Sequence, residues 1–311
     1  MVSVRTIGGN ENRRRCRSAD SHSSSRLCEY GAARWSREVA ASARNDQSNR
    51  PTLILSVPGV AAECQRPPML PRAFCELLLT DDVVVDDTEA HHLLHVLRLK
   101  PGDQLQLFDG CGMEADAVVA RINRREVFCA VTTRRQTSQI DRVHVTVIAA
   151  PPKPDRLKWM VEKLTEIGVA RLILLQTDRT EVTPRESRKE KLRSSVIAAC
   201  KQCRRNELMQ LSPLQTLTSV LDDVATARLP GKLWIAHPTP SMLSLSCNAV
   251  MPITSRLLLI GPEGGFTDAE VQAAVNAGAH MISWPHTILR IETAAIVFAT
   301  QLQASDRVRL T

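Results

Sequence analysis

From residue 143 onward the chain alternates short apolar runs with amphipathic stretches, and this alternation restricts the possible folds more than any other feature. The apolar runs predict buried strands at 143–150, 172–175, 233–236, 257–260 and 281–283. Helices are predicted between them at 155–167, 186–203, 268–277 and 292–304. Because parallel strands need long crossover connections, the pattern predicts an α/β fold with helices on both faces of a parallel sheet.

Two of the predicted strand-to-helix connections have an unusual composition. The first is Gly261-Pro262-Glu263-Gly264-Gly265-Phe266, and the second is Ile288-Leu289-Arg290-Ile291-Glu292-Thr293-Ala294. Ligands of α/β proteins usually bind where such connections leave the carboxyl ends of the strands. The first loop has neither the Lys-Ser/Thr ending of a Walker loop nor the spacing of a dinucleotide fingerprint, so it is not a nucleotide-phosphate loop.

Residues 69–139 have a different texture, which predicts a small β-barrel. Short strands are predicted at 83–85, 104–108, 115–119 and 127–132, with one helix at 87–97. The α/β domain is expected to occupy residues 140–311. Residues 1–68 show no period of 2 or 3.6, so this segment is predicted to be mostly disordered; it is either a flexible arm or a consequence of start-site choice, with Met69 as the true initiator.

The formal net charge of +7 overstates the charge of the folded part. Residues 1–68 hold 11 Lys+Arg and 6 Asp+Glu, which leaves 29 against 27 for residues 69–311. An argument for nucleic-acid binding must therefore rest on local clusters, and residues 121–158 hold nine Lys+Arg against three acidic residues.

Cysteine and histidine usage predicts the cellular setting and argues against a metal centre. The nine cysteines form no regular framework, and the apolar stretch at 53–62 is too short for a signal or membrane span, so a cytoplasmic protein is expected. His91, His92 and His95 could share a helical turn, and Cys200 and Cys203 form an isolated Cys-x-x-Cys. Since a structural zinc site needs four ligands, no metal is expected.

The two connection segments at 261–266 and 288–294 strongly resemble those of the RsmE family. Members of this family are SPOUT-class methyltransferases that act on N3 of a uridine in 16S ribosomal RNA. His91-His92-Leu93 with Val96-Leu97-Arg98-Leu99 resembles that family's PUA-like barrel, and Glu162-Lys163 with Glu166-Ile167-Gly168-Val169 resembles the first helix of its catalytic domain. The resemblance covers about residues 69–311. It implies a C-terminal trefoil knot, S-adenosylmethionine (SAM) as cofactor, a homodimer, and the small ribosomal subunit as substrate. One departure is Trp284-Pro285, where the family usually has Leu-Gly, and a cofactor-contacting amide could be lost there.

The resemblance also implies roles for individual residues. Arg290 is the first candidate for stabilising the uridine anion, with a structural role in the knot loop as the alternative. Glu292 and Glu263 are candidates for the general base or for holding the cofactor or Arg290, while Glu292 could instead act only on the helix dipole. The implied cofactor contacts are Ile260, Gly261, Pro262, Glu263, Gly264, Gly265, Ile288, Leu289, Arg290 and Thr293.

RNA affinity is expected to come from the barrel and the basic linker. Lys and Arg suit phosphate contacts, although an exposed charged surface without a ligand would have the same composition. The candidates are Arg98, Arg121, Arg124, Arg125, Arg134, Arg135, Lys153 and Arg156. Two other functions stay open: a SPOUT enzyme that methylates a ribose 2′-hydroxyl, and a catalytically degenerate RNA-binding factor for ribosome assembly.

Overall fold

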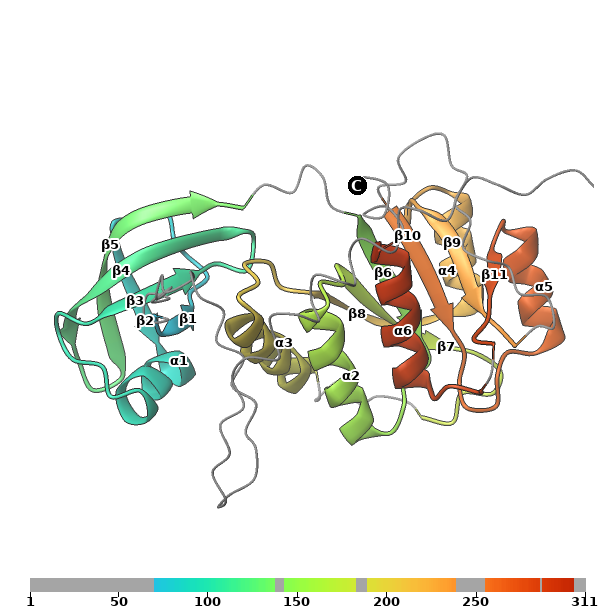
Figure 1. Ribbon diagram of the computed structural model, residues 1–311, viewed down its shortest axis with the longest axis horizontal. Coiled ribbons are helices and arrows are strands. Elements are labelled where there is room, and N and C mark those ends of the chain that lie inside the picture. The colour runs from blue at the N-terminus through green and yellow to red at the C-terminus, as the bar shows by residue number, and fades with distance from the viewer. Residues whose placement is uncertain (1–69, 138–142, 183–188, 239–254, 286, 305–311) are drawn as a thin grey trace, which may run out of the picture. The chain divides into compact units, whose positions relative to one another are not determined.

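The computed structural model describes residues 70–137, 143–182, 189–238, 255–285 and 287–304 (Figure 1). Every described residue belongs to one compact unit, which spans Arg66–Thr311. The predictions for residues 1–68 and for Met69 therefore lie outside the described residues. The predicted domain boundary at 139 and 140 also lies outside them.

The N-terminal part of this unit is a five-stranded mixed sheet in the order β1-β3-β4-β5-β2. Its strands are β1 (Arg72–Phe74), β2 (Asp82–Asp86), β3 (Gln104–Phe108), β4 (Met113–Ile122) and β5 (Glu126–Gln136). The four predicted strands are present, and β1, which pairs in parallel with β3, is additional. Alternate side chains such as Leu105, Leu107 and Ala117 are buried in one core, as the period of a strand requires.

The predicted helix at 87–97 has two geometries. α1 (Asp87–His91) is α-helical, and the chain continues as the π-helical turn η1 (His92–Val96). Leu97 N donates to the carbonyl of His92, five residues earlier, at 3.0 Å. Arg98 then has a φ of 55°, in the left-handed region, where a helix cannot continue. The extent of the helix was therefore predicted, and the wider turn was not.

The C-terminal part is a six-stranded, wholly parallel sheet in the order β11-β9-β10-β6-β7-β8. The strands are β6 (His144–Ala149), β7 (Arg171–Gln176), β8 (Gln210–Thr216), β9 (Lys232–Ala236), β10 (Ser255–Ile260) and β11 (His280–Ile282). Five match predicted runs. The sixth, β8, was missed because it is polar and contains Pro213, which is tolerated at the edge position that this strand occupies.

Helices cover both faces of this sheet (Figure 1). They are α2 (Pro154–Glu166), α3 (Lys189–Cys203), α4 (Leu217–Ala225), α5 (Asp268–Asn276) and α6 (Ile291–Ala304). On one face Val145 and Val147 of β6 share a core with Met160 of α2 and Phe298 of α6. On the other, Ile148 shares a core with Leu217 of α4, which was not predicted. The two faces of β6 are thus both apolar, as in a buried parallel strand.

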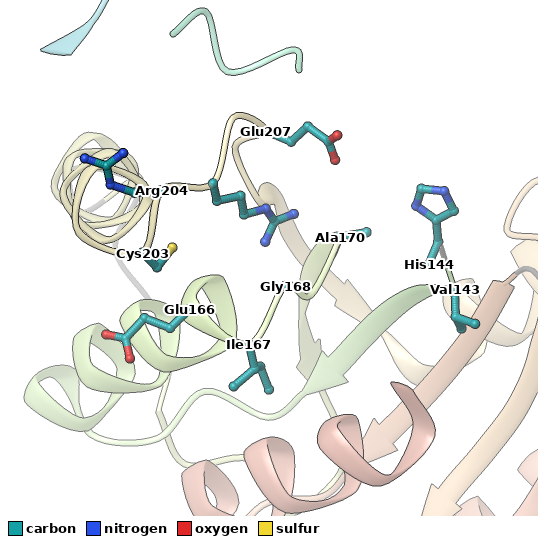
Figure 2. A pocket seen from close by; sticks show the side chains of 10 residues that line it. Val143, His144, Glu166, Ile167, Gly168, Ala170, Cys203, Arg204 and Glu207 are labelled. Carbon is teal, nitrogen blue, oxygen red and sulfur yellow. The ribbon is translucent and has the colours of Figure 1, made fainter. Parts of the chain in front are cut away.

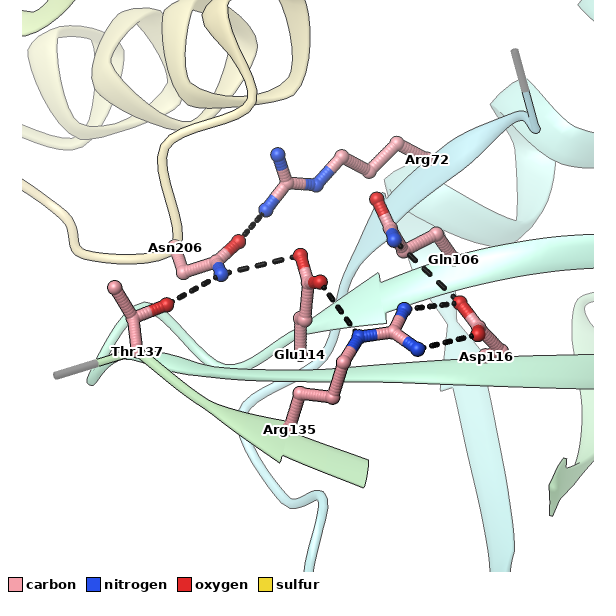
Figure 3. Close-up of polar contacts among 7 residues, drawn as sticks. All are labelled: Arg72, Gln106, Glu114, Asp116, Arg135, Thr137 and Asn206. Carbon is pink, nitrogen blue, oxygen red and sulfur yellow. Dashed lines mark hydrogen bonds and ion pairs between the residues drawn. The ribbon is translucent and has the colours of Figure 1, made fainter. Parts of the chain in front are cut away.

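A polar network joins the N-terminal sheet to the loop after α3 (Figure 3). Asn206 Oδ1 accepts a hydrogen bond from Arg72, and its amide donates to Glu114 at 3.1 Å and to Thr137 at 2.8 Å. Arg135 in turn pairs with Glu114 and Asp116, and its hydrogen bonds lower the pKa of the Asp116 carboxyl. The Asn206 side chain thus has three hydrogen-bond partners in or directly after the strands of this sheet.

We expect Asn206→Ala to lower the free energy of unfolding by about 1–3 kcal/mol, because it leaves partly buried partners without their hydrogen bonds. At about 2–4 °C per kcal/mol for a unit of this size, the melting temperature should fall by several degrees. Asn123→Ala is the matched control, since Asn123 makes a single exposed side-chain contact with Glu126. Equal melting of the two variants would contradict a structural role for the network.

Candidate cofactor and RNA site

The Gly-rich loop follows β10 and occupies the middle of the sheet's carboxyl edge, because β10 lies between β9 and β6. Gly265 has a φ of 71° and closes a turn by donating to the carbonyl of Pro262 at 2.8 Å. The amides of Glu263 and Gly264 donate to no group among the described residues. The loop therefore presents backbone donors that a ligand can use.

Gly261 is required by the residue that ends the loop. A Cβ at this position would lie 3.0 Å from two ring carbons of Phe266, which is itself buried. Ile260 is committed as well, because its carbonyl accepts a hydrogen bond from Ala150 at 2.9 Å. Of the predicted cofactor residues, Gly261 is therefore needed because no side chain fits there. The Ile260 carbonyl already accepts a backbone hydrogen bond from Ala150 and is not free for a ligand.

The helix after the loop starts as its capping box predicts. Thr267 Oγ1 accepts from the amide of Glu270, and the Glu270 carboxylate accepts from the amide of Thr267 at 2.8 Å. The other carboxylate oxygen of Glu270 accepts from the amide of Asp178, in the loop after β7, at 2.9 Å. Glu270 thereby ties the loop after β7 to the first turn of α5.

Arg179 is a site residue that the sequence reasoning missed. Its Nη1 donates to the carbonyl of Gly264 at 2.8 Å, and its side-chain carbons would lie 3.4 Å from a Cβ at Gly264. The available signal was its place, directly after the predicted strand at 172–175, where side chains reach the carboxyl edge. Arg179 therefore holds the Gly-rich loop through the carbonyl of Gly264.

The second segment leads into α6, and the start of α6 lies at the same edge of the sheet as the Gly-rich loop. α6 packs against β6 and β10. Its last turn lies at the opposite edge, because the carbonyl of Leu302 accepts a hydrogen bond from Arg256 near the start of β10. The helix therefore runs antiparallel to the strands, and its first turn, with Glu292, is carried to the carboxyl edge.

Side chains of the second segment differ greatly in exposure. Ile288 is 90% exposed and Arg290 is exposed, whereas Leu289 packs on the core. The Arg290 side chain has no hydrogen bond or ion pair among the described residues, and the same holds for Glu263. Glu292, by contrast, is only 6% exposed. Arg290 and Glu263 can thus meet a ligand without breaking an existing contact.

Glu292 pairs with a residue that was predicted to bind RNA. Its Oε1 lies 3.8 Å from Nε of Arg156, in the first turn of α2. Thr293, predicted to contact the cofactor, is exposed next to it. Trp284, of the unusual Trp284-Pro285 pair, is 40% exposed, and residue 286 lies outside the described part of the chain. The effect of this pair on the cofactor stays a prediction.

A cavity of about 260 Å³ lies at the other edge of the sheet (Figure 2). His144 at the start of β6 and Ala170 just before β7 line it, together with Arg205 and Glu207 of the loop after α3. Arg205 also donates to the carbonyls of Thr165 and Val169 and so satisfies the end of α2. This cavity is therefore separate from the predicted cofactor site.

Two protein-family models match this chain and identify its family. The model described as an RNA methyltransferase domain matches residues 139–303, and the model of an RNA methyltransferase PUA domain matches residues 85–132. The chain belongs to the RNA methyltransferase family. The resemblance that the motifs indicated and the α/β fold class are thereby confirmed.

Relatives of this methyltransferase cover most of its length. Ribosomal RNA small subunit methyltransferase E of Mycobacterium tuberculosis is 30% identical over 69% of this chain and 83% of its own. The Bacillus subtilis protein of that name is 28% identical over 70% of this chain and 91% of its own. A solved Legionella pneumophila methyltransferase with bound SAM is 28% identical, has a TM-score of 0.66, and covers 76% of this chain and 98% of its own. The knot stays a prediction, because strand order does not describe how the chain threads.

Of the methyltransferase's eight predicted RNA-binding residues, Arg156 pairs with Glu292, and the other seven fall into two groups. Arg98, Arg121, Arg124, Arg125 and Lys153 are exposed, and Arg121 also stacks on Phe128 at 4.0 Å. Arg134 and Arg135 are engaged with carboxylates, Arg134 with Asp81 at 2.9 Å. We therefore expect the turn between β4 and β5, with Arg124 and Arg125, to carry more of the phosphate contact than the end of β5.

Two absences hold for the described residues. They contain no group of three or more His, Cys, Asp or Glu side chains arranged to hold a metal ion. The rings of His91 and His95 do lie 4.5 Å apart, without a third ligand in reach. Nor does any helix in this part of the chain have the length and apolar character needed to cross a membrane.

Proposed function

We propose that this enzyme transfers the methyl group of SAM to N3 of a uridine in the 16S RNA of the small ribosomal subunit. The observation that carries the proposal is the placement of Arg290. Its exposed guanidinium has no partner among the described residues, and it directly precedes the helix that starts at the same edge as the Gly-rich loop. A cation in that position is available to a substrate that becomes anionic.

The residues of the carboxyl edge fit the cofactor. SAM supplies an electrophilic methyl group on a sulfonium, so the protein mainly has to bind and orient it. The amides of Glu263 and Gly264 are available, and Arg179 fixes the loop that carries them. Apolar Leu289 and exposed Ile288 can cover an adenine ring. These residues would hold SAM beside Arg290.

The acceptor sets the remaining chemical requirement. N3 of uridine carries a proton, and its removal places negative charge on the ring and its carbonyl oxygens. Arg290 can stabilise that charge with several donors in a fixed fork. Glu263 is exposed and has no partner among the described residues, so of the two carboxylates in these segments it is the more accessible candidate for the base.

Two further properties belong to the same proposal. We expect a homodimer, supported by exposed apolar side chains of the catalytic domain: Trp159 is 46% exposed and Ile288 is 90% exposed. We expect the enzyme to act in the cytoplasm, where ribosomal subunits are assembled. Ribose 2′-O-methylation and a non-catalytic role in assembly remain the alternatives.

The experiment is methyl transfer from labelled SAM to three acceptors: unmethylated small subunits, naked 16S RNA and large subunits. We expect label in small-subunit RNA and none in large-subunit RNA, because recognition by shape and phosphate contacts requires the folded acceptor. RNA binding without any transfer would contradict the proposed activity and would favour the assembly-factor alternative.

A further inference from the structure

The first observation is that a buried carboxylate, Glu292, lacks hydrogen-bond donors for one of its oxygens within the described part of the chain. Glu292 is 6% exposed, and its Oε2 has no hydrogen-bond donor among the described residues. Its Oε1 has one close cation, the Nε of Arg156, at 3.8 Å. Burying a carboxylate is costly unless it is paired with a cation and hydrogen-bonded. Among the described residues, the ion pair with Arg156 is therefore the one charge contact of the buried Glu292 carboxylate, and the role of Glu292 depends on Arg156.

The second observation concerns the free part of Arg156. The ion pair uses Nε, and neither Nη1 nor Nη2 makes a hydrogen bond or ion pair with any described residue. The Arg156 side chain is 38% exposed, so these two nitrogens can reach a ligand from solvent. A guanidinium whose Nε faces a carboxylate leaves Nη1 and Nη2 as a pair of donors, which matches the oxygens of a phosphate.

The third observation is position. Arg156 is the third residue of α2, which follows β6, and β6 is the neighbour of β10, whose end carries the Gly-rich loop. Glu292 stands in the first turn of α6, two residues after Arg290. The pair therefore lies at the edge of the sheet where the methyl transfer is proposed, and not with the basic candidates of the N-terminal sheet.

From these contacts we infer that Arg156 and Glu292 form one unit, in which the buried carboxylate aims the Arg156 guanidinium at a backbone phosphate beside the target nucleotide. Arg156 is then a substrate-positioning residue of the catalytic domain, and Glu292 acts through it. The inference rests on the proposed function and deepens it. It also separates the two carboxylates: Glu263 stays available for the proton, and Glu292 does not take it.

The test compares Arg156→Ala, Glu292→Gln and the double variant in methyl transfer to unmethylated small subunits. We expect each single change to raise KM for the subunit about tenfold, with kcat within about threefold. The double variant should be no worse than Arg156→Ala, because both changes remove the same contact. Arg156→Ala should also reduce the dependence of subunit affinity on salt by about one counterion.

The matched control is Lys191→Ala. Lys191 is the third residue of α3, as Arg156 is of α2, and it is exposed, so the variant loses one positive charge from an equivalent place in a helix. Its KM should stay within about twofold of the wild type. Glu292→Gln preserves the shape of a buried side chain, and its melting curve will show whether the fold is retained.

Three results would overturn the inference. A loss of kcat above about a hundredfold in Glu292→Gln at unchanged KM would make Glu292 the base. If Arg156→Ala binds SAM more weakly in the absence of the subunit, Arg156 contacts the carboxylate of the cofactor and not the RNA. Wild-type KM in both single variants would leave the pair with no role in substrate binding. If the wild type transfers no methyl group, the proposed function fails, and subunit-binding titrations of the same variants still test the pair.

Discussion

Arg290→Ala is expected to reduce the rate of methyl transfer by about 10²–10³-fold, which corresponds to about 2.7–4 kcal/mol of lost transition-state stabilisation. The guanidinium is exposed and has no partner among the described residues, so its removal leaves no buried group unpaired. The melting temperature and the affinity for SAM should therefore stay close to those of the wild type. Single-turnover kinetics with saturating subunits will separate the chemical step from binding.

Arg290→Lys sharpens this prediction. Lysine keeps the charge but not the planar fork, so we expect it to recover only part of the rate. Arg228→Ala is the control, because Arg228, in the turn after α4, is also exposed and, among the described residues, its side chain pairs only with Asp223 of that helix. An Arg290→Ala enzyme with the wild-type rate would remove Arg290 from the chemistry and leave it with the structural role that the sequence also allowed.

Gly261→Ala is expected to weaken SAM binding at least tenfold and to lower stability by about 1–3 kcal/mol, as overpacking does. The new Cβ would lie 3.0 Å from the Phe266 ring and 3.3 Å from the Phe266 amide nitrogen. Since Phe266 is buried in the core under α5, the loop and not the ring must shift, and the cofactor-facing amides shift with it. Calorimetric titration with SAM measures the effect.

Two variants identify the cause of that loss. Gly278→Ala introduces strain at a φ of 88°, with open space around the Cβ and outside the Gly-rich loop. It should cost stability while leaving the affinity for SAM within about twofold. Adding Phe266→Leu to Gly261→Ala should restore part of the affinity, because a smaller side chain makes room. Unchanged SAM binding by Gly261→Ala would show that the loop is not the cofactor cradle.

The parts of the fold that the sequence predicted are those with strong local signals. Buried parallel strands are apolar throughout, and the capping box at Thr267 and Glu270 marks the start of α5 within one residue. β8 and α4 were missed for the opposite reason. β8 is a polar edge strand containing Pro213, and α4 is a nine-residue helix stabilised by packing Leu217 and Val220 on the sheet.

The candidate site shows the same division. Both motif segments could be read from the sequence, because each follows an apolar strand and carries unusual residues. The contacts between loops could not, since Arg179 with Gly264 and Arg156 with Glu292 are separated by 85 and 136 positions in the chain. The sequence analysis grouped Arg156 with the basic linker. In the structure α2 packs on α6, and this packing places Arg156 beside Glu292.

The most direct measurement is the identity of the methylated nucleoside. RNA from small subunits treated with enzyme and labelled SAM is digested to nucleosides and separated against standards. The account predicts N3-methyluridine as the labelled product, at one site in 16S RNA. Label in a 2′-O-methylated nucleoside, or in a methylated base other than uridine, would contradict it.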